Sequence, residues 1–581
     1  MAVRRKVYRN RLRRECQYLA GAFSFCMREF KSISDYATDD VIIRLLAKER
    51  GKFTAKNGRK RESHEQLYQE QLKPMMPPRA IWTNPGKSRR PQSGKNLHGL
   101  AAWTGKKRMG KARVYITICK ELSRGNNDPW AVNLRAFIQR IQEILNGTLE
   151  LKIEKPEIIA KFKEQESQTG HLIYRPISAY RSLETKILVS LAYNYLLYYF
   201  DGCFHSNMLF MRSARKDREG RWKTPNYLDA IRLADAYRRK HDRENIYVGE
   251  CDIQKFYDIF NHDDILECFE ELFKIKKAHD PKIQDIAFDP IRRLIKAYLD
   301  SYDYKKDVIG KNDDPEFWLK EKQIHATPDN PNPICRFKWV KPEAFLESGC
   351  YASDAEFQQA CNEGKIGVPQ GGALSGMIVN VVMNVIDSGI VDPKDPGRFF
   401  VRYCDDILLM HTDKCKCEQY LDYYEKALTQ HKLLPHKMEY VSQIKNGAKT
   451  TPRFWHSKSK HVYLWGRGAD DASDWVGFVG FEMRRTGEIR VRKDKIDTEA
   501  KRIARTYYSV INSNHPEKRI EQFGSLPGHI RDFELITVDR YTIAQAKHLD
   551  NYLSRKIAQA ARKTGAPVPE GLTSYQQELN T

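Results

Sequence analysis

The chain has 581 residues, 41% of them hydrophobic and 30% charged, and this length predicts two to four structural units rather than one core. Lysine and arginine number 99 against 75 acidic residues, and the net charge of +24 favours a polyanionic partner, most often nucleic acid, over a merely solubilising surface. No apolar stretch approaches the roughly 18 residues of a membrane-spanning helix. The N-terminal sequence has no apolar region typical of a signal peptide, and the residue after Met1 is Ala2, not the glycine that myristoylation needs.

These absences predict a cytoplasmic protein without a membrane partner. Twelve cysteines are present, and none forms a C-x-x-C pair. The closest two, Cys415 and Cys417, are separated by one residue, which is poor spacing for zinc. Without an export signal, free thiols in a reducing compartment are the expected state.

Residues 1–170 predict a basic, mostly helical extension. Its start is arginine-rich, and the stretch at 77–113, rich in Gly, Pro, Lys and Arg, predicts a loop that fits either a disordered linker or an RNA-binding segment. Trp82 and Trp103 favour the second, because aromatic rings stack on bases. The periodicity of 128–145 predicts a helix with one apolar face. The candidate RNA-binding residues are Arg4, Arg5, Lys6, Arg9 and Arg11.

The pattern changes to mixed α and β after residue 170. Residues 246–252 predict a buried strand that ends at Asp252 and leads into a loop and a helix. Residues 275–365 are polar, with Asp-Pro, Asn-Pro and Gly breaks, and predict an irregular insertion. Regular structure returns at Gly367. Further elements are expected as strands around 403–406, at 473–481 and at 488–492, and as helices at 419–430 and from Asp494 onward.

Three acidic residues are the strongest candidates for chemistry: Asp252, Asp405 and Asp406. The last two lie between the apolar stretches FFVRYC and ILLM, which predict a β-hairpin with an acidic turn. A surface turn is the ordinary explanation of an Asp-Asp pair, but the apolar strands favour an inward site. Adjacent carboxylates repel unless a cation lies between them. Two Mg²⁺ ions, bound by carboxylates, water and substrate phosphate, supply such cations in nucleotidyl transfer.

Several motifs occur in the order found in reverse transcriptases, and together they carry a resemblance to that family. Tyr403-Cys404-Asp405-Asp406 resembles the Y-x-D-D box, and Asp252 followed by Phe256-Tyr257 resembles the first palm motif. Gly367-Val-Pro369-Gln370-Gly371-Gly-Ala-Leu-Ser375 resembles the G-x-P-Q-G motif, and the helix after it carries Asn380 and Asp387. His436-Lys437-Met resembles the lysine motif, although the residues on either side of the lysine differ from the usual ones. Gly477-Phe-Val-Gly480-Phe481 resembles the primer grip, and Tyr174-Arg175 and Phe210-Met-Arg212 resemble the fingers motifs.

The resemblance covers about residues 172–495 and implies an α+β right-hand polymerase with fingers, palm and thumb. Its activity would be RNA-directed DNA synthesis. The expected domains are a basic, probable RNA-binding N-terminal extension at 1–170, fingers and the first part of the palm at 171–274, an insertion at 275–365, the palm with the Y-x-D-D box and primer grip at 366–494, and a helical thumb at 495–581.

The same resemblance implies a role for each motif residue. Asp252 and Asp405 would hold two Mg²⁺ ions, or Mn²⁺ in their place, with help from Asp406. The ring of Tyr257 would lie under the incoming sugar and exclude a 2′ hydroxyl, with the neighbouring Phe256 as the alternative gate. Gln370 and Gly371 would lie behind the template base and nucleotide, and Arg175 and Lys186 would bind the triphosphate. Lys437 would protonate the pyrophosphate, and Gly477, Gly480 and Phe481 would hold the primer.

The subfamily is inferred by elimination and analogy. The part after Asp494 is too short for the maturase region of a group II intron protein, and the N-terminal extension is too large for a retron enzyme. The chain most resembles bacterial defence-associated and abortive-infection reverse transcriptases, whose members often use a dedicated non-coding RNA and form oligomers. The implied partners are a structured RNA template, dNTPs, the DNA product and further copies of the chain.

Two alternatives remain at this stage. One is an RNA-dependent RNA polymerase, against which Tyr257 and the Y-x-D-D box argue. The other is a non-catalytic RNA-binding scaffold with a polymerase fold, against which the presence of all three acids argues. The choice of nucleotide in a primer-extension assay separates the two polymerases.

Overall fold

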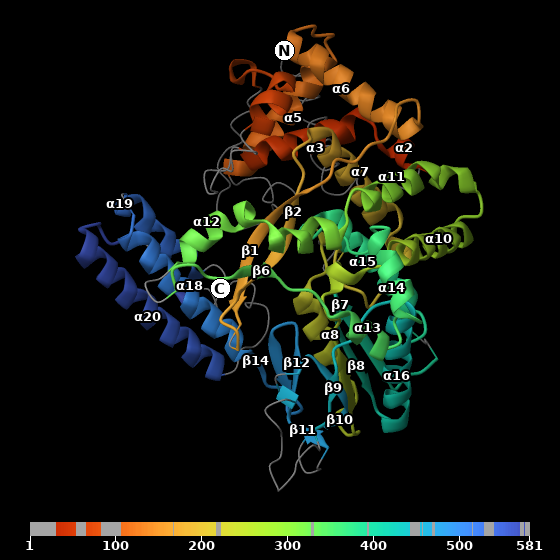
Figure 1. The fold of residues 1–581 in the computed structure, drawn as a ribbon, viewed down its shortest axis with the longest axis vertical. Helices are drawn as coiled ribbons and strands as arrows, with labels where there is room; N and C mark the ends of the chain where they lie inside the picture. Colours follow the sequence, from red (N-terminus) through yellow and green to blue (C-terminus); the bar gives the residue numbers. More distant parts are fainter. Residues whose placement is uncertain are drawn as a thin grey trace, which may run out of the picture.

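The structure is a computed structural model of a mixed α+β protein (Figure 1). It describes residues 31–53, 66–82, 106–166, 168–216, 222–326, 330–391, 394–441, 454–455, 457–466, 471–513, 515–527, 540–569 and 574–575. Within these ranges, no helix is both long and apolar enough to cross a lipid bilayer.

Helices gather at the N-terminal end of the described chain, at the top of Figure 1. They are α2 (Ile33–Tyr36), α3 (Asp39–Phe53), α5 (Lys106–Leu122), α6 (Pro129–Asn146) and α7 (Leu183–Tyr199). The helix predicted at 128–145 is confirmed as α6. It has a proline in its first turn, ends at Gly147 in the left-handed conformation, and buries its apolar face.

The loop predicted at 77–113 is wrong for its last part, because α5 already begins at Lys106. The apolar side chains Val114 and Ile118 of α5 are fully buried in the helical core. Burial of this apolar face stabilises the helix, and the basic residues that had suggested a loop form its first turns.

A three-stranded sheet lies below these helices in Figure 1. Strand β1 (Glu157–Gln165) pairs antiparallel with β2 (Leu172–Ala179), and β2 pairs parallel with β6 (Cys335–Phe337). The ring of Tyr174 on β2 packs against Trp318, with the ring centroids 5.1 Å apart. Two segments far apart in the sequence therefore build one sheet with a shared aromatic core.

The segment expected to be an irregular insertion, 275–365, is mostly helical. Two of its three Asp-Pro sequences, interpreted as breaks, are helix starts: Pro290 and Pro315 lie in the first turns of two helices, where a missing N–H costs nothing. Asp280-Pro281 is a break, in the turn that follows the helix ending at His279. The assignment of the segment as a separate insertion stays a prediction. Its helices are the end of α10 (His262–His279), α11 (Asp289–Asp300), α12 (Pro315–His325), α13 (Pro342–Glu347) and α14 (Asp354–Asn362).

The central sheet has the strand order β11-β10-β5-β8-β7, with β9 beside β10. Its side chains alternate between two cores. Phe400 and Leu409 belong to the core that contains α15 (Ala373–Asp387) and α16 (Lys414–Gln430), whereas Leu408 belongs to the core that contains α8 (Tyr227–Lys240). The strands are β5 (Tyr247–Cys251), β7 (Arg398–Tyr403), β8 (Asp406–His411), β9 (Met438–Glu439), β10 (Ser459–Trp465) and β11 (Ala472–Ser473).

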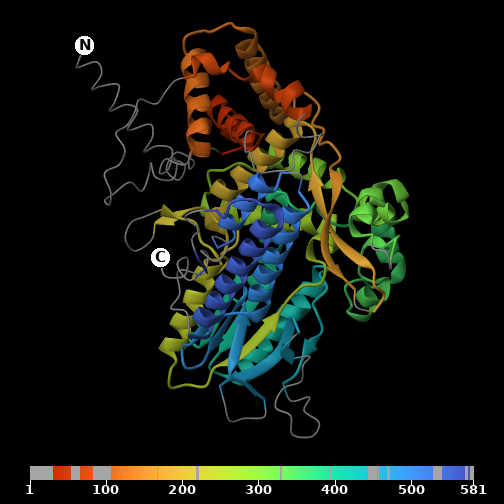
Figure 2. The same cartoon turned by 90° about the vertical axis from the view of Figure 1, so that its left-hand side faces the viewer.

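The strand predicted at 473–481 is divided by a hairpin. Strands β12 (Trp475–Phe478) and β13 (Phe481–Arg484) pair antiparallel, and Val479 and Gly480 form a two-residue turn with φ of 43° and 91°. β14 (Ile489–Val491) completes this small sheet. The helical C-terminal part is confirmed in α18 (Lys493–Ile511), α19 (Pro516–Arg519) and α20 (Arg540–Thr564), and α18 lies along α20 (Figure 2).

Short elements connect these parts. They are α9 (Phe256–Ile259), β3 (Arg215–Lys216), β4 (Trp222–Lys223), and single turns of 3-10 or π helix at Tyr68–Leu72, Lys73–Met75, Arg79–Ile81, Asp201–Cys203, Asp285–Phe288, Tyr304–Val308, Ile309–Asp313 and Ile520–Ser525.

Candidate active site

Three carboxylates meet where β5 and the β7–β8 hairpin end. β5 pairs antiparallel with β8, with Cys251 opposite Ile407. Asp252 follows Cys251 and Asp406 precedes Ile407, so the register places these two acids opposite each other, with Asp405 in the adjoining turn. The predicted hairpin therefore delivers its acidic turn to the end of the predicted strand.

The turn between β7 and β8 has an unusual backbone. Cys404 has a φ of 62°, in the left-handed region that residues other than glycine rarely adopt. The buried Arg402 donates from Nη1 to the carbonyl oxygen of Cys404 at 3.0 Å and from Nε to Asp387 Oδ2 at 2.8 Å. A buried ion pair thus ties the acidic turn to the end of α15.

Burial and mutual repulsion change the titration of the acids. Asp252 is only 5% exposed. The pKa of Asp405 is raised by burial and then by the charge of Asp252. The pKa of Asp406 is raised to about 7 by burial and by both other acids, although Asp406 keeps an exposed edge. A divalent cation among these oxygens would relieve the repulsion, so the donor set fits the predicted Mg²⁺ site.

Two basic side chains lie beside Asp252: Lys458, which the sequence analysis did not identify, and His436, which it named only as part of the lysine motif. The Lys458 amino group forms an ion pair with its carboxylate, and His436 Nε2 lies 3.8 Å from its Oδ2. Burial, followed by the charge of Lys458, lowers the pKa of His436. Lys458 reaches this position because β10 pairs antiparallel with β5, with Lys460 opposite Glu250. Strand register is not readable from a single sequence, so no signal could have found it.

The lysine assigned from the sequence, Lys437, is exposed next to His436. In the part of the chain that the structure describes, no hydrogen bond or ion pair joins Lys437 to the three acids. Its role as a proton donor stays a prediction.

Tyr257 lies between the G-x-P-Q-G loop, where Val368 N–H donates to its carbonyl oxygen at 2.8 Å, and the acidic turn. Its hydroxyl is 3.7 Å from Cys404 Sγ, and its ring is half-buried. Phe256 is 4% exposed and packs on Phe260, with the ring centroids 4.8 Å apart. The segment is the short helix α9 and not an extended strand. The two rings leave neighbouring positions of this helix and contact each other edge to face, with the ring centroids 5.7 Å apart.

The loop with Gln370 and Gly371 is attached to the three-stranded sheet of β1, β2 and β6. The carbonyl oxygen of Gln370 accepts the N–H of Ser178 at 2.8 Å, and its side-chain amide donates to the buried Asp258. Gly371 has a φ of 95°, and a Cβ there would lie 3.1 Å from Ile177 Cγ2. Only glycine gives both the conformation and the close approach to β2.

A group of cations lies around the first palm motif. Burial lowers the pKa of Lys255, and the charges of Lys163, Lys338 and Arg175 lower it further. Arg175 is exposed on β2. Of these four, the sequence analysis named Arg175 alone. The structure does not bring the predicted Lys186 to this group, because Lys186 lies on α7, where its charged neighbours are in α3 and at Glu154.

The primer-grip residues form the β12–β13 hairpin. A Cβ on Gly477 would lie 1.9 Å from Arg492 Nη2, and one on Gly480 would lie 2.7 Å from Lys495 Cε. Phe481 is buried and stacks on Tyr227 at a centroid distance of 6.3 Å. The charge of Arg492 acts on the carboxyl of Asp406. The hairpin therefore lies beside the acidic site.

The predicted RNA-binding residues Arg4, Arg5, Lys6, Arg9 and Arg11, and also Trp103, lie outside the described residues. Trp82 is described. The Arg50 guanidinium carbon lies 4.2 Å from its ring centroid, and its indole N–H donates to the Pro77 carbonyl at 3.0 Å. A protein cation therefore already covers one face of the ring that was expected to stack on a base.

The chain has one family-level match. The family model for reverse transcriptase (RNA-dependent DNA polymerase) matches residues 335–481, which include the G-x-P-Q-G loop, Asp405, Asp406 and the β12–β13 hairpin. No curated protein sequence matches.

Among solved structures, the chain is similar to apo telomerase from Candida tropicalis, with 12% identity, a TM-score of 0.33, and coverage of 81% of this chain and 77% of that chain. It is also similar to telomerase from Candida albicans in complex with a TWJ fragment of telomeric RNA, with 13% identity, a TM-score of 0.30, and coverage of 80% and 71%. Because both TM-scores are low, no conclusion about this chain rests on these two structures. The family match indicates a reverse transcriptase (RNA-dependent DNA polymerase) domain at residues 335–481, and the acidic hairpin lies within it.

Proposed function

We propose that the chain copies RNA into DNA by nucleotidyl transfer at Asp252, Asp405 and Asp406. The observation that carries the proposal is the convergence of these acids at the ends of β5 and β8, with raised pKa values for the last two. Asp252 and Asp405 would hold two Mg²⁺ ions, or Mn²⁺ in their place, assisted by Asp406. When bound, the ions would supply positive charge at the attacking 3′ hydroxyl and the leaving pyrophosphate.

The surrounding residues would bind and orient the nucleotide. Tyr257 would exclude a 2′ hydroxyl, and Gln370 and Gly371 would back the nucleotide. Arg175 and Lys163 would contact the triphosphate, since the charges of both act on Lys255 in the first palm motif and Arg175 is exposed on β2. Lys437 is the proposed proton donor to pyrophosphate. The role of Lys186 at the triphosphate stays a prediction, and the charged groups that act on its pKa are Glu49, Lys52 and Glu154.

Substitution of one acid tests the proposal. Asp405→Asn removes a metal ligand with little change in shape, and DNA synthesis should fall by about 10³-fold or more while RNA binding stays unchanged. Asp422→Asn, on an exposed position of α16, is the matched control and should keep full activity. Synthesis by Asp405→Asn at the rate of the control would exclude this site.

The same assay separates the alternative functions. Single-nucleotide extension with dNTP and rNTP should show a preference for dNTP. A preference for rNTP would indicate an RNA-dependent RNA polymerase. Absence of extension with either nucleotide, together with tight RNA binding, would indicate a non-catalytic scaffold.

We further propose that the template is a dedicated structured non-coding RNA, bound by the basic N-terminal extension of a homo-oligomer. The net charge of +24 supports a nucleic-acid partner. Binding through phosphates should weaken steeply with salt, and deletion of Met1 to Glu15 should lower both RNA affinity and the salt slope. Unchanged affinity after the deletion would assign the segment to packing or oligomerisation instead.

The finer proposal is a role in bacterial antiphage defence, which rests on the analogy with defence-associated reverse transcriptases. A bacterial host that expresses the chain should form fewer phage plaques than one that expresses Asp405→Asn. Equal plaque counts for the two across a broad phage panel would remove the defence role and leave the polymerase proposal intact.

A further inference from the structure

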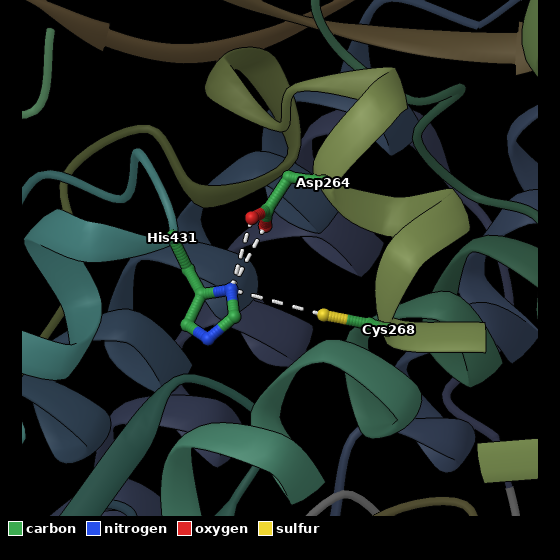
Figure 3. A group of neighbouring side chains, drawn as sticks. All are labelled: Asp264, Cys268 and His431. Carbon is green, nitrogen blue, oxygen red and sulfur yellow. Dashed lines mark hydrogen bonds and ion pairs between the residues drawn. The ribbon is translucent and has the colours of Figure 1, made fainter. Parts of the chain in front are cut away.

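Three side chains that take no part in the acidic site converge on one point (Figure 3). Asp264 and Cys268 are one turn apart on α10 and lie on the same face. His431 follows the last residue of α16. Its Nδ1 lies 3.0 and 3.2 Å from the two Asp264 carboxylate oxygens and 3.8 Å from Cys268 Sγ.

A hydrogen bond from His431 Nδ1 can satisfy Asp264 but not Cys268 as well. His431 Nδ1 carries at most one hydrogen. If the hydrogen is present, it goes to Asp264, and the nitrogen has no lone pair left for the Cys268 thiol. If it is absent, the nitrogen lone pair faces the carboxylate lone pairs of Asp264. A cation at the centre would accept electron pairs from all three atoms at once.

The separations suit a tetrahedral metal ion. Bond lengths of about 2.0–2.3 Å to oxygen, nitrogen and sulfur imply ligand-to-ligand separations of roughly 3.3–3.6 Å in a tetrahedral zinc site. The observed nitrogen-to-oxygen and nitrogen-to-sulfur distances lie on either side of these values, and all three ligand atoms are within 4.8 Å of one another. Small side-chain rotations are enough to reach the ideal separations.

Burial and charge also favour a cation there. Cys268 is 1% exposed, whereas the side chains of Asp264 and His431 are 11% and 23% exposed. The ligand set is therefore anchored in the interior and reachable by solvent at His431, so a water could complete the coordination as fourth ligand. The charges of Glu267 and Glu271 also act on the Cys268 thiol, so the surroundings are negative.

We propose that Asp264, Cys268 and His431 bind Zn²⁺. A thiolate, an imidazole and a carboxylate together select a borderline-soft divalent ion over Mg²⁺. The ligand backbones are already held in place: the Asp264 N–H donates to Asn261 Oδ1 at 3.1 Å, and the His431 N–H donates to Ala427 O at 3.1 Å. The proposal does not depend on the polymerase activity.

The ion would hold together the two segments that support Asp252. One segment runs from Asp252 into α10, and the other runs from His431 to His436. They are already joined near the acid, where Gln254 N–H donates to Leu434 O at 2.8 Å and His436 N–H donates to Asp252 O at 2.8 Å. The zinc site would fasten their far ends, so its expected role is to stabilise the palm.

Metal analysis of the purified full-length protein tests the proposal. After extensive dialysis against excess Mg²⁺, mass spectrometry should find about one Zn²⁺ per chain. Co²⁺ in its place should give a thiolate-to-cobalt charge-transfer band. Cys268→Ser and His431→Asn should each weaken Zn²⁺ binding in a chelator competition by at least about a hundredfold. Loss of a residue that only hydrogen-bonds to a metal ligand already lowers metal affinity about 10- to 100-fold.

Two control variants make the result specific. Cys361→Ala removes another buried cysteine, on α14, and Asp405→Asn alters the acidic site; both should keep the Zn²⁺. Circular dichroism and the metal-free melting temperature confirm that each variant folds. Wild-type protein that does not bind Zn²⁺ even when titrated with it would overturn the proposal and leave a hydrogen-bonded Asp264–His431 pair. The proposal would also be overturned if Cys268→Ser and His431→Asn retain Zn²⁺, or if Asp405→Asn loses it.

Discussion

Arg402 and Asp387 form an ion pair at 2.8 Å between two side chains with no exposure to solvent. Within the described structure, Arg402 Nη2 and Asp387 Oδ1 have no hydrogen-bond partner. Burial raises the pKa of Asp387 to about 6 even though the arginine lowers it. An ion pair this costly is poor support for stability alone. Its other contact, from Arg402 Nη1 to the Cys404 carbonyl, points to a role in positioning the acidic turn.

Asp387→Asn should therefore damage both folding and catalysis. It leaves the Arg402 charge buried without a counter-charge, which costs about 3–5 kcal/mol in the free energy of unfolding. The double variant Asp387→Leu with Arg402→Met should recover much of that stability but not the rate, because the Cys404 carbonyl then lacks its donor. Denaturant unfolding and primer extension measure the two effects. Full activity of the stable double variant would show that the pair does not position the turn.

Asp258 gives a pH-dependent prediction. Burial raises its pKa to about 6 in the folded chain, above its ordinary value, despite the nearby Lys255 and the hydrogen bond from Gln370. Folding therefore favours the protonated form, and the contribution of Asp258 to stability is lost as the pH rises from about 4 through 6. Asp258→Asn has no charge to bury. The stability of this variant relative to wild type should rise by roughly 2–3 kcal/mol between pH 4 and pH 7.

Denaturant unfolding at several pH values measures this difference. The comparison with wild type cancels the other titrating groups, provided that they are far from Asp258. A difference that stays constant across this pH range would mean that Asp258 is ionised at low pH in the folded chain.

Gly477 should be needed for full polymerase activity because the Arg492 side chain lies against it. A Cβ at Gly477 would come within 1.9 Å of Arg492 Nη2, so Gly477→Ala should displace that side chain from its place near Asp406. We expect kcat/KM for primer extension to fall about tenfold, a loss of about 1.4 kcal/mol. Gly202→Ala is the control, since a Cβ at Gly202 has no heavy atom within 4 Å. Equal extension by both variants would contradict this reading of the hairpin.

Much of the site was predictable because each of its motifs is local in the sequence. The acidic hairpin needs only two apolar stretches and a polar turn, and the turn at 403–406 and the strand before Asp252 were both predicted and are both present. The helix at 128–145 was predictable for the same reason, since its apolar positions repeat at helical spacing.

Features that depend on distant parts of the chain were not predictable. Lys458 meets Asp252 through the register of β10 on β5, which local sequence does not encode. The Asp-Pro pairs at 289–290 and 314–315 serve equally well as breaks and as helix starts, and buried contacts of α11 and α12 decide between them. The cluster of Asp264, Cys268 and His431 likewise joins residues more than a hundred positions apart.

Sugar selection is the prediction that distinguishes neighbouring residues most sharply. Tyr257 is half-buried with its hydroxyl 3.7 Å from Cys404 Sγ, next to the acidic turn, whereas Phe256 is 4% exposed in an aromatic cluster with Phe260. Tyr257→Val should admit a 2′ hydroxyl and reduce the discrimination against rNTP by roughly a hundredfold, which corresponds to about 3 kcal/mol. The measurement is kcat/KM for dNTP and for rNTP separately in single-nucleotide extension.

Phe256→Val is the matched control, because it shortens an adjacent ring of similar size. Loss of a buried aromatic ring should lower the free energy of unfolding by about 3 kcal/mol or more and leave the ratio of kcat/KM values for dNTP and rNTP unchanged. The two rings touch edge to face at a centroid distance of 5.7 Å, but Phe256 is buried against Phe260 whereas the Tyr257 hydroxyl faces Cys404. The Tyr257 variant should therefore change discrimination, and the Phe256 variant should change stability. Discrimination lost in Phe256→Val but kept in Tyr257→Val would move the gate by one residue. Discrimination kept in both would mean that no ring of this segment contacts the sugar, and the preference for deoxynucleotides would need another source.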